Sequence, residues 1–209
     1  MKGEKGRELK RARLLRFRES EDEKPGNGRS DDDIMLSVTT DVSELRLLFE
    51  RHHRALFGFF FRVSGNRTAS EDLVQDVFFR ILKYRHTYRA GIPFTRWMYR
   101  IAINARRDQM RKHQCQEVLD GLAHDPPGPG PIPDEELSKQ QELVRLRESL
   151  LRLAEPKREV LVLSRYQNLK YDEIGAILGV SPGTVKVRVY RALQELRELF
   201  FESSGEERT

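Results

Sequence analysis

Cysteine is nearly absent from this sequence of 209 residues, which contains only Cys115. A single cysteine excludes an intramolecular disulfide framework and every metal site built from several cysteines. Long apolar runs are absent too, since the longest, residues 56–61, is far too short to span a bilayer. The N-terminus also lacks the apolar segment of a signal peptide. We therefore expect a cytoplasmic protein with no membrane insertion.

Groupings of residues that support catalysis are also missing. His52 and His53 are adjacent on an expected helix and so cannot both face one site. No set of carboxylates or thiols in the sequence assembles a nucleophile or a metal site. We expect no enzymatic activity, no metal and no cofactor.

Charge is what the sequence has in excess. Charged residues make up 34% and hydrophobic residues 38%, with a net charge of +5, and this apolar share is below the usual globular value. Residues 1–18 hold eight basic and two acidic residues, net +6, whereas residues 19–33 hold seven acidic and two basic ones, net −5. Adjacent blocks of this kind stay solvated, which predicts a charged, disordered extension over residues 1–40.

Proline and glycine divide the rest of the chain. Five of the nine prolines fall in residues 126–133 and alternate with glycine, a pattern that supports neither helix nor strand. It predicts a flexible linker over residues 116–136. Folded pieces are expected on either side, at residues 41–115 and 137–202, with a tail at 203–209. Because neither piece contains strand-like alternation or an Asn-Gly turn, the expected fold class is all-α, with two small helical domains joined by a Pro/Gly-rich linker.

Two helix starts are indicated in the N-terminal piece. Asp41 or Ser43 is placed to cap a helix whose apolar residues recur at helical spacing, and Ser70 is placed to cap the next one. The exposed side of that second helix carries Asp72, Gln75, Asp76 and Arg80. Taken by itself, this row is an ordinary solvated face.

A third helix, expected to follow Pro93, sorts its side chains into two faces at about 100° per residue. The packing face holds Trp97, Met98, Ile101, Ala102 and Ala105, and the opposite face holds Arg96, Arg100, Asn104, Arg107 and Arg111. Residues 95–113 contain six basic residues against Asp108, net +5. A stripe of one sign indicates a polyanionic partner. Nearby aromatic residues offer flat faces for unpaired bases, although Phe94 and Trp97 also suit a core.

The C-terminal piece has the layout of a helix-turn-helix. A first helix begins at residues 155–159. A short helix over residues 171–178 then meets Gly179, which suits a tight turn. Ser181 suits the cap of the following helix, residues 183–197. The outward face of that helix carries Thr184, Val187, Arg188 and Arg191. Such a face fits a major groove, and an αα-hairpin with an incidental basic face is the alternative.

Three motifs, in this order, resemble a known family. They are Glu71-Asp-Leu-Val-Gln-Asp-Val-Phe78, Phe94-x-x-Trp97-Met-x-Arg100-Ile-Ala-x-Asn104-x-x-x-Asp108-x-x-Arg111 and Gly183-Thr-Val-Lys-x-Arg-x-x-Arg191-Ala. They look like regions 2 and 4 of a bacterial RNA polymerase sigma factor, and the short segment between them resembles the extracytoplasmic-function (ECF) group of the sigma-70 family. The resemblance implies a transcription initiation factor that binds core RNA polymerase, recognises the −10 and −35 elements of promoter DNA and assists promoter melting.

The resemblance also implies roles for individual residues. Docking on core RNA polymerase falls to Asp72, Gln75 and Asp76. Contacts with the −10 element fall to Arg96, Trp97, Arg100, Asn104, Arg107, Arg111 and Lys112. One base of that element would flip into a pocket beneath the loop around residues 83–94. Contacts with the −35 element fall to Ser181, Thr184, Lys186, Val187, Arg188 and Arg191. Members of this group are commonly held inactive by an anti-sigma factor, which is therefore a further expected partner.

Two positions depart from the family pattern. Val187 stands where many relatives have Ser, and we expect it to contact a thymine methyl group, which an apolar side chain in the major groove prefers. Gly175 stands where relatives usually have Ala, and a glycine inside a helix costs up to about 1 kcal/mol. The main alternative to a sigma factor is a stand-alone helix-turn-helix regulator, which binds DNA without polymerase and dimerises on two half-sites.

Overall fold

The structure, a computed structural model, describes residues 28–120 and 137–202, and within these residues every regular element is a helix. The elements in chain order, with η for a 3-10 helix, are α2 (Asp31–Val38), η1 (Val42–Glu44), α3 (Leu45–Ser64), α4 (Arg67–Tyr84), η2 (Arg85–Thr87), α5 (Phe94–Asp120), α6 (Leu137–Arg152), α7 (Glu155–Arg165), α8 (Tyr171–Leu178) and α9 (Pro182–Glu202). The all-α prediction is confirmed. The Pro/Gly-rich segment, the basic block at the N-terminus and the C-terminal tail lie outside the described residues.

Helix α2 corrects the predicted boundary at residue 41. Its N-cap is Ser30, whose Oγ accepts the backbone N–H of Asp33 at 3.1 Å. The acidic residues of its first turn lie at the positive end of the helix dipole, where negative charge is stabilising. The apolar residues that follow are fully buried: Ile34, Met35 and Val38. The end of the acidic block is therefore the start of a packed helix rather than part of a disordered extension.

Capping explains where α3 and α4 begin. Asp41 accepts the backbone N–H of Ser43 at 2.9 Å, as predicted, and starts η1, which continues into α3. The predicted cap at Ser70 is wrong. Asn66 caps α4 by accepting the N–H of Ala69 at 3.0 Å, and Ser70 lies fully buried inside the helix, with its hydroxyl donating to the carbonyl of Asn66 at 2.6 Å. Asn66 lies four residues earlier, and asparagine is as strong a cap as serine.

The helix-turn-helix has the predicted layout. Helix α8 ends at Gly179, whose φ of 72° is left-handed, and Ser181 accepts the backbone N–H of Thr184 at 3.2 Å at the start of α9. Gly175 was expected only to lower the stability of its helix, but the structure gives this glycine a role in the turn. A Cβ on Gly175 would lie 2.7 Å from the carbonyl oxygen of Val180, so the tight turn requires glycine there. The same approach lets the Val180 N–H donate to the Gly175 carbonyl at 2.9 Å.

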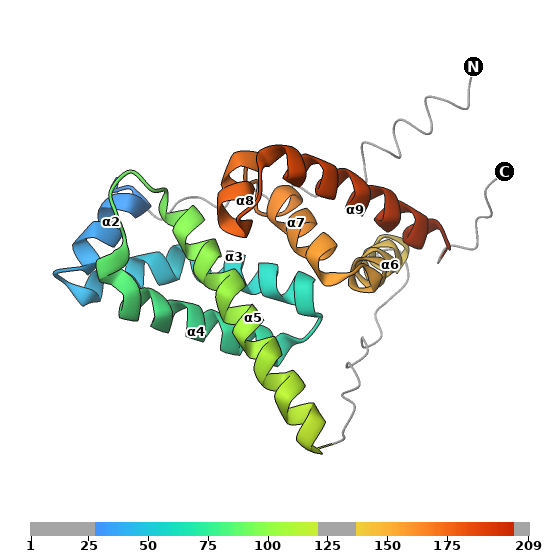
Figure 1. Ribbon diagram of the computed structural model, residues 1–209, viewed down its shortest axis with the longest axis horizontal. Coiled ribbons are helices and arrows are strands. Elements are labelled where there is room, and N and C mark those ends of the chain that lie inside the picture. The colour runs from blue at the N-terminus through green and yellow to red at the C-terminus, as the bar shows by residue number, and fades with distance from the viewer. Residues whose placement is uncertain (1–27, 121–136, 203–209) are drawn as a thin grey trace.

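The two helical groups pack directly on each other, which the sequence does not indicate. Helices α2–α5 form one half and α6–α9 the other, and α3 and α5 of the first half contact α6, α7 and α8 of the second (Figure 1). The buried apolar residues of both halves form one cluster. Helix α5 continues to Asp120, so the linker predicted to begin at residue 116 is helical over its first five residues.

Polar bonds hold this contact between the halves. From the second half, Arg147 donates to the carbonyl of Gly65 at 3.1 Å and Arg158 to that of Val63 at 2.5 Å. From the first half, the Tyr99 hydroxyl donates to Gln167 Oε1 at 2.6 Å. We call this arrangement the closed form.

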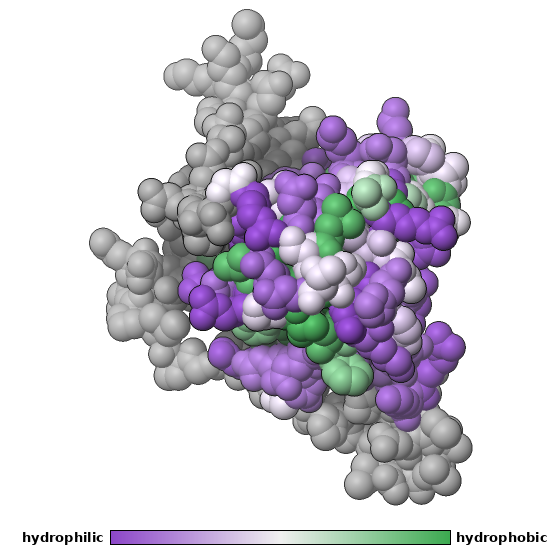
Figure 2. Space-filling model, turned by 90° about the vertical axis from the view of Figure 1, so that its left-hand side faces the viewer, coloured by the Kyte–Doolittle hydropathy of each residue, from purple (hydrophilic) through white to green (hydrophobic). Residues whose placement is uncertain are grey.

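The surface at the α2 end of the molecule is mostly hydrophilic, with small apolar patches between polar side chains (Figure 2). The exposed large apolar residues of the first half are Leu36, Val42, Phe49, Phe79 and Tyr84. Among the residues described, no helix combines the length and the apolar character needed to cross a membrane.

Candidate nucleic-acid interface

Helix α5 separates its faces much as its periodicity predicts. Met98, Ala102 and Ala105 are buried in the core, and Trp97 and Ile101 are half-buried against it. The exposed side carries Arg100, Asn104, Arg107 and Arg111, Lys112 is exposed further along the helix, and Arg96 is half-buried at its start. Of the seven residues predicted to bind the −10 element, five are thus exposed and four line one solvent-facing stripe.

Arg106 is the basic residue of α5 that the sequence assigned to neither face. It is 6% exposed and turns toward the second half of the chain, where its Nη1 donates to Glu155 Oε1 at 2.6 Å and lies 3.3 Å from Glu159 Oε1. On a helical wheel that starts at Arg96 it falls at roughly 280°, just beyond the apolar arc. That position was the signal available in the sequence. The stripe therefore carries one positive charge fewer than the count of six basic residues indicated.

Glu159 is the most deeply buried carboxylate at this contact, with its side chain 5% exposed. Burial raises its pKa above the ordinary value, and the neighbouring Arg106 and Arg107 guanidinium groups oppose that rise. Arg107 reaches Glu159 only at 3.9 Å and keeps 47% of its side chain exposed. Arg107 therefore lies both on the solvent-facing stripe and at the edge of the contact between the halves.

The acidic face of α4 is the predicted polymerase-docking surface. Asp72 and Gln75 are exposed, and Asp76 is half-buried and accepts from Arg80 at 2.9 Å. Arg80 also donates to Asp108 of α5 at 2.7 Å, which ties the docking face to the basic helix and lowers the pKa of Asp108.

Phe79 lies on the same side of α4 as these residues, at helical spacing from Asp72 and Gln75, and is 65% exposed. Phe79 was not predicted from the sequence. Its exposed ring adds an apolar group to the polar row.

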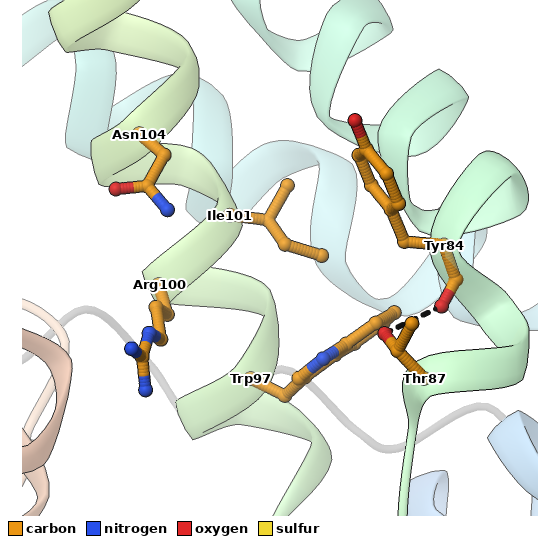
Figure 3. A pocket seen from close by; sticks show the side chains of 6 residues that line it. All are labelled: Tyr84, Thr87, Trp97, Arg100, Ile101 and Asn104. Atoms are coloured by element: carbon orange, nitrogen blue, oxygen red, sulfur yellow. Dashed lines mark hydrogen bonds between the residues drawn. The ribbon is translucent and has the colours of Figure 1, made fainter.

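A small cavity of about 170 Å³ opens between the end of α4 and the first turns of α5. Its lining residues are Tyr84, Thr87, Trp97, Arg100, Ile101 and Asn104. In Figure 3, Tyr84 and Thr87 stand on one side, Arg100 and Asn104 on the other, and the Trp97 ring lies between them. A cavity of about 150 Å³ is known to hold a benzene ring, so this one is of the size of a single flat ring rather than of a larger ligand.

The aromatic residues near the basic helix divide into two groups. Phe94, Tyr99 and Tyr88 are 1%, 3% and 6% exposed and belong to the core, and burial raises the pKa of the Tyr99 hydroxyl. Trp97 and Tyr84 line the cavity. Core packing therefore accounts for Phe94, while Trp97 contacts the core with one part of its ring and the cavity with another.

The outward face of α9 is open. Ser181, Thr184, Lys186, Val187, Arg188 and Arg191 are all exposed, while Val185, Val189 and Ala192 are buried on the opposite side. Val187 is 48% exposed, as its predicted orientation requires. Tyr190, one turn further along the same face, is 64% exposed and was not predicted. Two helical units that each present one exposed basic helix define a DNA-binding protein built in two parts.

Comparisons with known proteins agree with this division. A family model described as Sigma-70 region 2 matches residues 48–115, and one described as Sigma-70, region 4 matches residues 143–196. RNA polymerase sigma factor CarQ of Myxococcus xanthus is 33% identical over 155 residues, which cover 74% of this chain and 88% of that protein. ECF RNA polymerase sigma factor SigE of Mycolicibacterium smegmatis is 32% identical over 166 residues, 76% of this chain and 62% of that protein.

A solved structure shows the same fold. The sigma factor RpoE of Bartonella quintana, crystallised in complex with the anti-sigma factor NepR, matches with a TM-score of 0.63 and 27% identity over 74% of this chain and 94% of that one. The chain belongs to the sigma-70 family and, within it, to the ECF group. It is a promoter-directing transcription initiation factor. The stand-alone regulator is not favoured, because region 2 accompanies the helix-turn-helix in one chain.

Proposed function

We propose that this protein directs core RNA polymerase to promoters by dividing the task among three surfaces: the polar face of α4, the basic stripe of α5 and the outward face of α9. It acts in the cytoplasm, where core polymerase is, and contributes no catalytic group of its own. The observation that carries the proposal is the exposure of two DNA-suited helix faces on two sigma-factor regions of one chain.

The polar face of α4 docks on core polymerase. Asp72 and Gln75 supply exposed polar contacts, and Arg80 holds Asp76 in place. Phe79 provides the apolar anchor, since well-packed aromatic side chains carry much of the free energy of protein interfaces.

The basic stripe of α5 binds the −10 element. Arg100, Arg107 and Arg111 contact phosphates, which gives affinity that falls steeply with salt. The cavity next to the stripe takes one unpaired base, which stacks on the partly exposed Trp97 ring. Asn104 carries both a hydrogen-bond donor and an acceptor, so it is suited to read the edge of that base.

The outward face of α9 reads the −35 element in the major groove. Lys186, Arg188 and Arg191 supply positive charge, and Ser181 lies at the exposed N-terminus of the helix, which is suited to a phosphate. Val187 contacts a thymine methyl group.

The closed form must open for both elements to be read at once. The −10 and −35 elements lie about 25 base pairs apart, which is about 85 Å of duplex at about 3.4 Å per base pair. Helix α5 is in direct contact with α8 in the closed form. Docking of each half on core polymerase therefore separates them and sets the distance between the two DNA-binding surfaces.

An anti-sigma factor is the remaining partner that we propose. The similar solved structure, RpoE of Bartonella quintana, is bound to one, and the match covers 74% of this chain. An anti-sigma factor that favours the closed form would keep both halves off polymerase.

Reconstitution with core RNA polymerase tests the proposed function. We expect the purified protein to start transcription at defined positions on genomic fragments. Arg111→Ala should weaken opening on every promoter at moderate salt, and Phe79→Ala should lower the affinity for core polymerase without changing promoter preference. Arg165→Ala, which removes an exposed positive charge from α7, is the matched control. If neither variant differs from this control, the assignment of the surfaces is wrong.

A further inference from the structure

Asp32 in α2 contacts the first residue of the −10 helix. Its Oδ1 accepts the backbone N–H of Phe94 at 2.6 Å and lies 2.9 Å from the hydroxyl of Tyr88. The residue before Phe94 is Pro93, which has no side-chain oxygen with which to cap the helix. The capping carboxylate of α5 therefore comes from a helix 62 residues earlier in the chain.

The two groups that Asp32 contacts support adjacent parts of the lining of the cavity. Tyr88 directly follows Thr87, and Phe94 lies one turn before Trp97; Thr87 and Trp97 both line the cavity (Figure 3). The Tyr88 ring also packs edge-on against Trp97, with ring centroids 5.3 Å apart. A shift of Tyr88 or of the first turn of α5 would therefore move the surface on which a base stacks.

Both groups are buried, and the Asp32 carboxylate is the acceptor of the Phe94 N–H. Phe94 is 1% exposed and Tyr88 is 6% exposed. A buried N–H without an acceptor is costly, and a bond to a carboxylate is among the strong hydrogen bonds of proteins. Burial and the neighbouring Asp32 raise the pKa of the Tyr88 hydroxyl, which keeps it protonated and able to donate. That proton is shared with the carbonyl of Ile92, 2.7 Å away.

Helix α2 itself is held by the adjacent carboxylate. Asp31 accepts from Arg51 and from His52 of α3 at 2.7 Å each. Asp31 thus fastens α2 to α3, while Asp32 reaches the loop and α5.

We propose that Asp32 is a positioning residue for −10 recognition, which fixes the loop before α5 and the first turn of α5 and thereby sets the shape of the base cavity. The inference rests on the proposed function, since it assigns a role at the same cavity. It assigns a role in −10 recognition to a residue of α2, which lies before the matched region 2 at residues 48–115.

The test measures base preference by the holoenzyme. Core polymerase with the parent, Asp32→Asn or Asp32→Ala would be titrated against single-stranded oligonucleotides that carry the −10 sequence of a promoter found by reconstitution, with each of the four bases at the position that enters the cavity. Affinity for core polymerase and for −35 duplex would be measured in parallel. Asp33→Asn is the matched control, because Asp33 lies in the same turn but is exposed, and its carboxylate accepts from Ser30 rather than from Phe94 or Tyr88.

We expect Asp32→Ala to reduce the preference between the best base and the others by about 5- to 30-fold, the factor that 1–2 kcal/mol represents. Asp32→Asn should lose less, because its amide oxygen still accepts a hydrogen bond. Core affinity, −35 affinity and the Asp33→Asn protein should stay unchanged. Tyr88→Phe should reproduce part of the loss and add little to Asp32→Ala in a double mutant.

Three results would overturn the proposal. An unchanged base preference in a holoenzyme that still opens promoters would remove it and leave the proposed function intact. Weaker binding of all four bases alike, in step with a lower melting temperature, would reduce Asp32 to a purely structural residue. A parent protein that failed to bind core polymerase would overturn the proposed function, and this inference with it.

Discussion

Replacing Arg106 by alanine should separate the two halves of the protein. Arg106 is the cation between Glu155 and Glu159, with 7% of its side chain exposed. Its removal leaves Glu159 buried without its nearest countercharge and next to a second carboxylate. The variant changes none of the residues assigned to polymerase or DNA.

The magnitude follows from the burial of this cluster. Removing one partner of a buried ion pair typically costs about 3–5 kcal/mol. Glu155 keeps 25% of its side chain exposed, and Glu159 can take up a proton, so about 2–3 kcal/mol is the better value. At 1.36 kcal/mol per factor of ten, this shifts the ratio of closed to open form by about 30- to 150-fold.

Small-angle X-ray scattering measures the expected opening. The radius of gyration of Arg106→Ala should rise above that of the parent at pH 8, while its circular dichroism should keep the same helical content. Retained helix distinguishes opening from unfolding. Arg165→Ala removes the same charge from an exposed position of α7 and should stay as compact as the parent.

A change of pH gives a second readout. Because burial raises the pKa of Glu159 in the closed form, that form binds a proton more tightly than the open one. The resulting stabilisation is present at low pH and is lost as the pH rises through the raised pKa. Without Arg106 the pKa of Glu159 should rise further, so Arg106→Ala should close again as the pH falls. A variant as compact as the parent at pH 8 would refute the role of this cluster.

Three further substitutions have definite expected results. The bonds from His52 and then Arg51 lower the pKa of Asp31 from 3.8 to about 2. Asp31→Asn should therefore lower the free energy of unfolding by about 1–2 kcal/mol at pH 7. In denaturant titrations this difference between the variant and the parent should vanish as the pH falls from about 4 to 2. Gly175→Ala should destabilise by about 1–3 kcal/mol through the clash at the turn, and a higher melting temperature would contradict this. Val187→Ser should change the preference at one thymine of the −35 element in a binding assay over all base substitutions, and an unchanged profile would remove the proposed methyl contact.

The helices and the exposed DNA-binding faces could be predicted from the sequence because local rules decide them. Hydrophobic periodicity predicts which side of α5 and which side of α9 packs against the core. Gly179 and Ser181 are residue types that favour a tight turn and a helix N-cap, so both could be assigned from the sequence. The short helix α2 was missed because its three leading acidic residues resemble a solvated block. Only burial of the apolar residues behind them shows that they begin a helix.

Features that depend on distant contacts could not be predicted in this way. Gly175 looks like a defect in the sequence because the carbonyl that excludes a Cβ belongs to Val180, beyond the turn. Asp32 looks like one acid among three, and only the fold brings it to the N-terminus of α5. Arg106 counts as one of six positive charges until its partners in α7 are known.

Part of the contact between the halves consists of ion pairs and cation–π pairs, which a binding partner could replace with contacts of its own. Besides the Arg106 cluster it includes Arg62 stacked over Tyr166 at 4.4 Å and Arg147 over Phe61 at 4.0 Å, and cation–π pairs contribute only about 0.5–1 kcal/mol where they are exposed. These polar contacts accompany the apolar cluster that the two halves share, and contacts between domains that mix polar and apolar groups resemble transient protein interfaces.

Arg107 links this contact to DNA binding. It lies 3.9 Å from Glu159 in the closed form and is also the proposed phosphate contact of the −10 stripe. A phosphate bound to Arg107 in the closed form would bring a second negative charge close to the Glu159 carboxylate, which disfavours both contacts at once. Closure and promoter binding therefore compete for it, and by linkage each weakens the other by the same free energy.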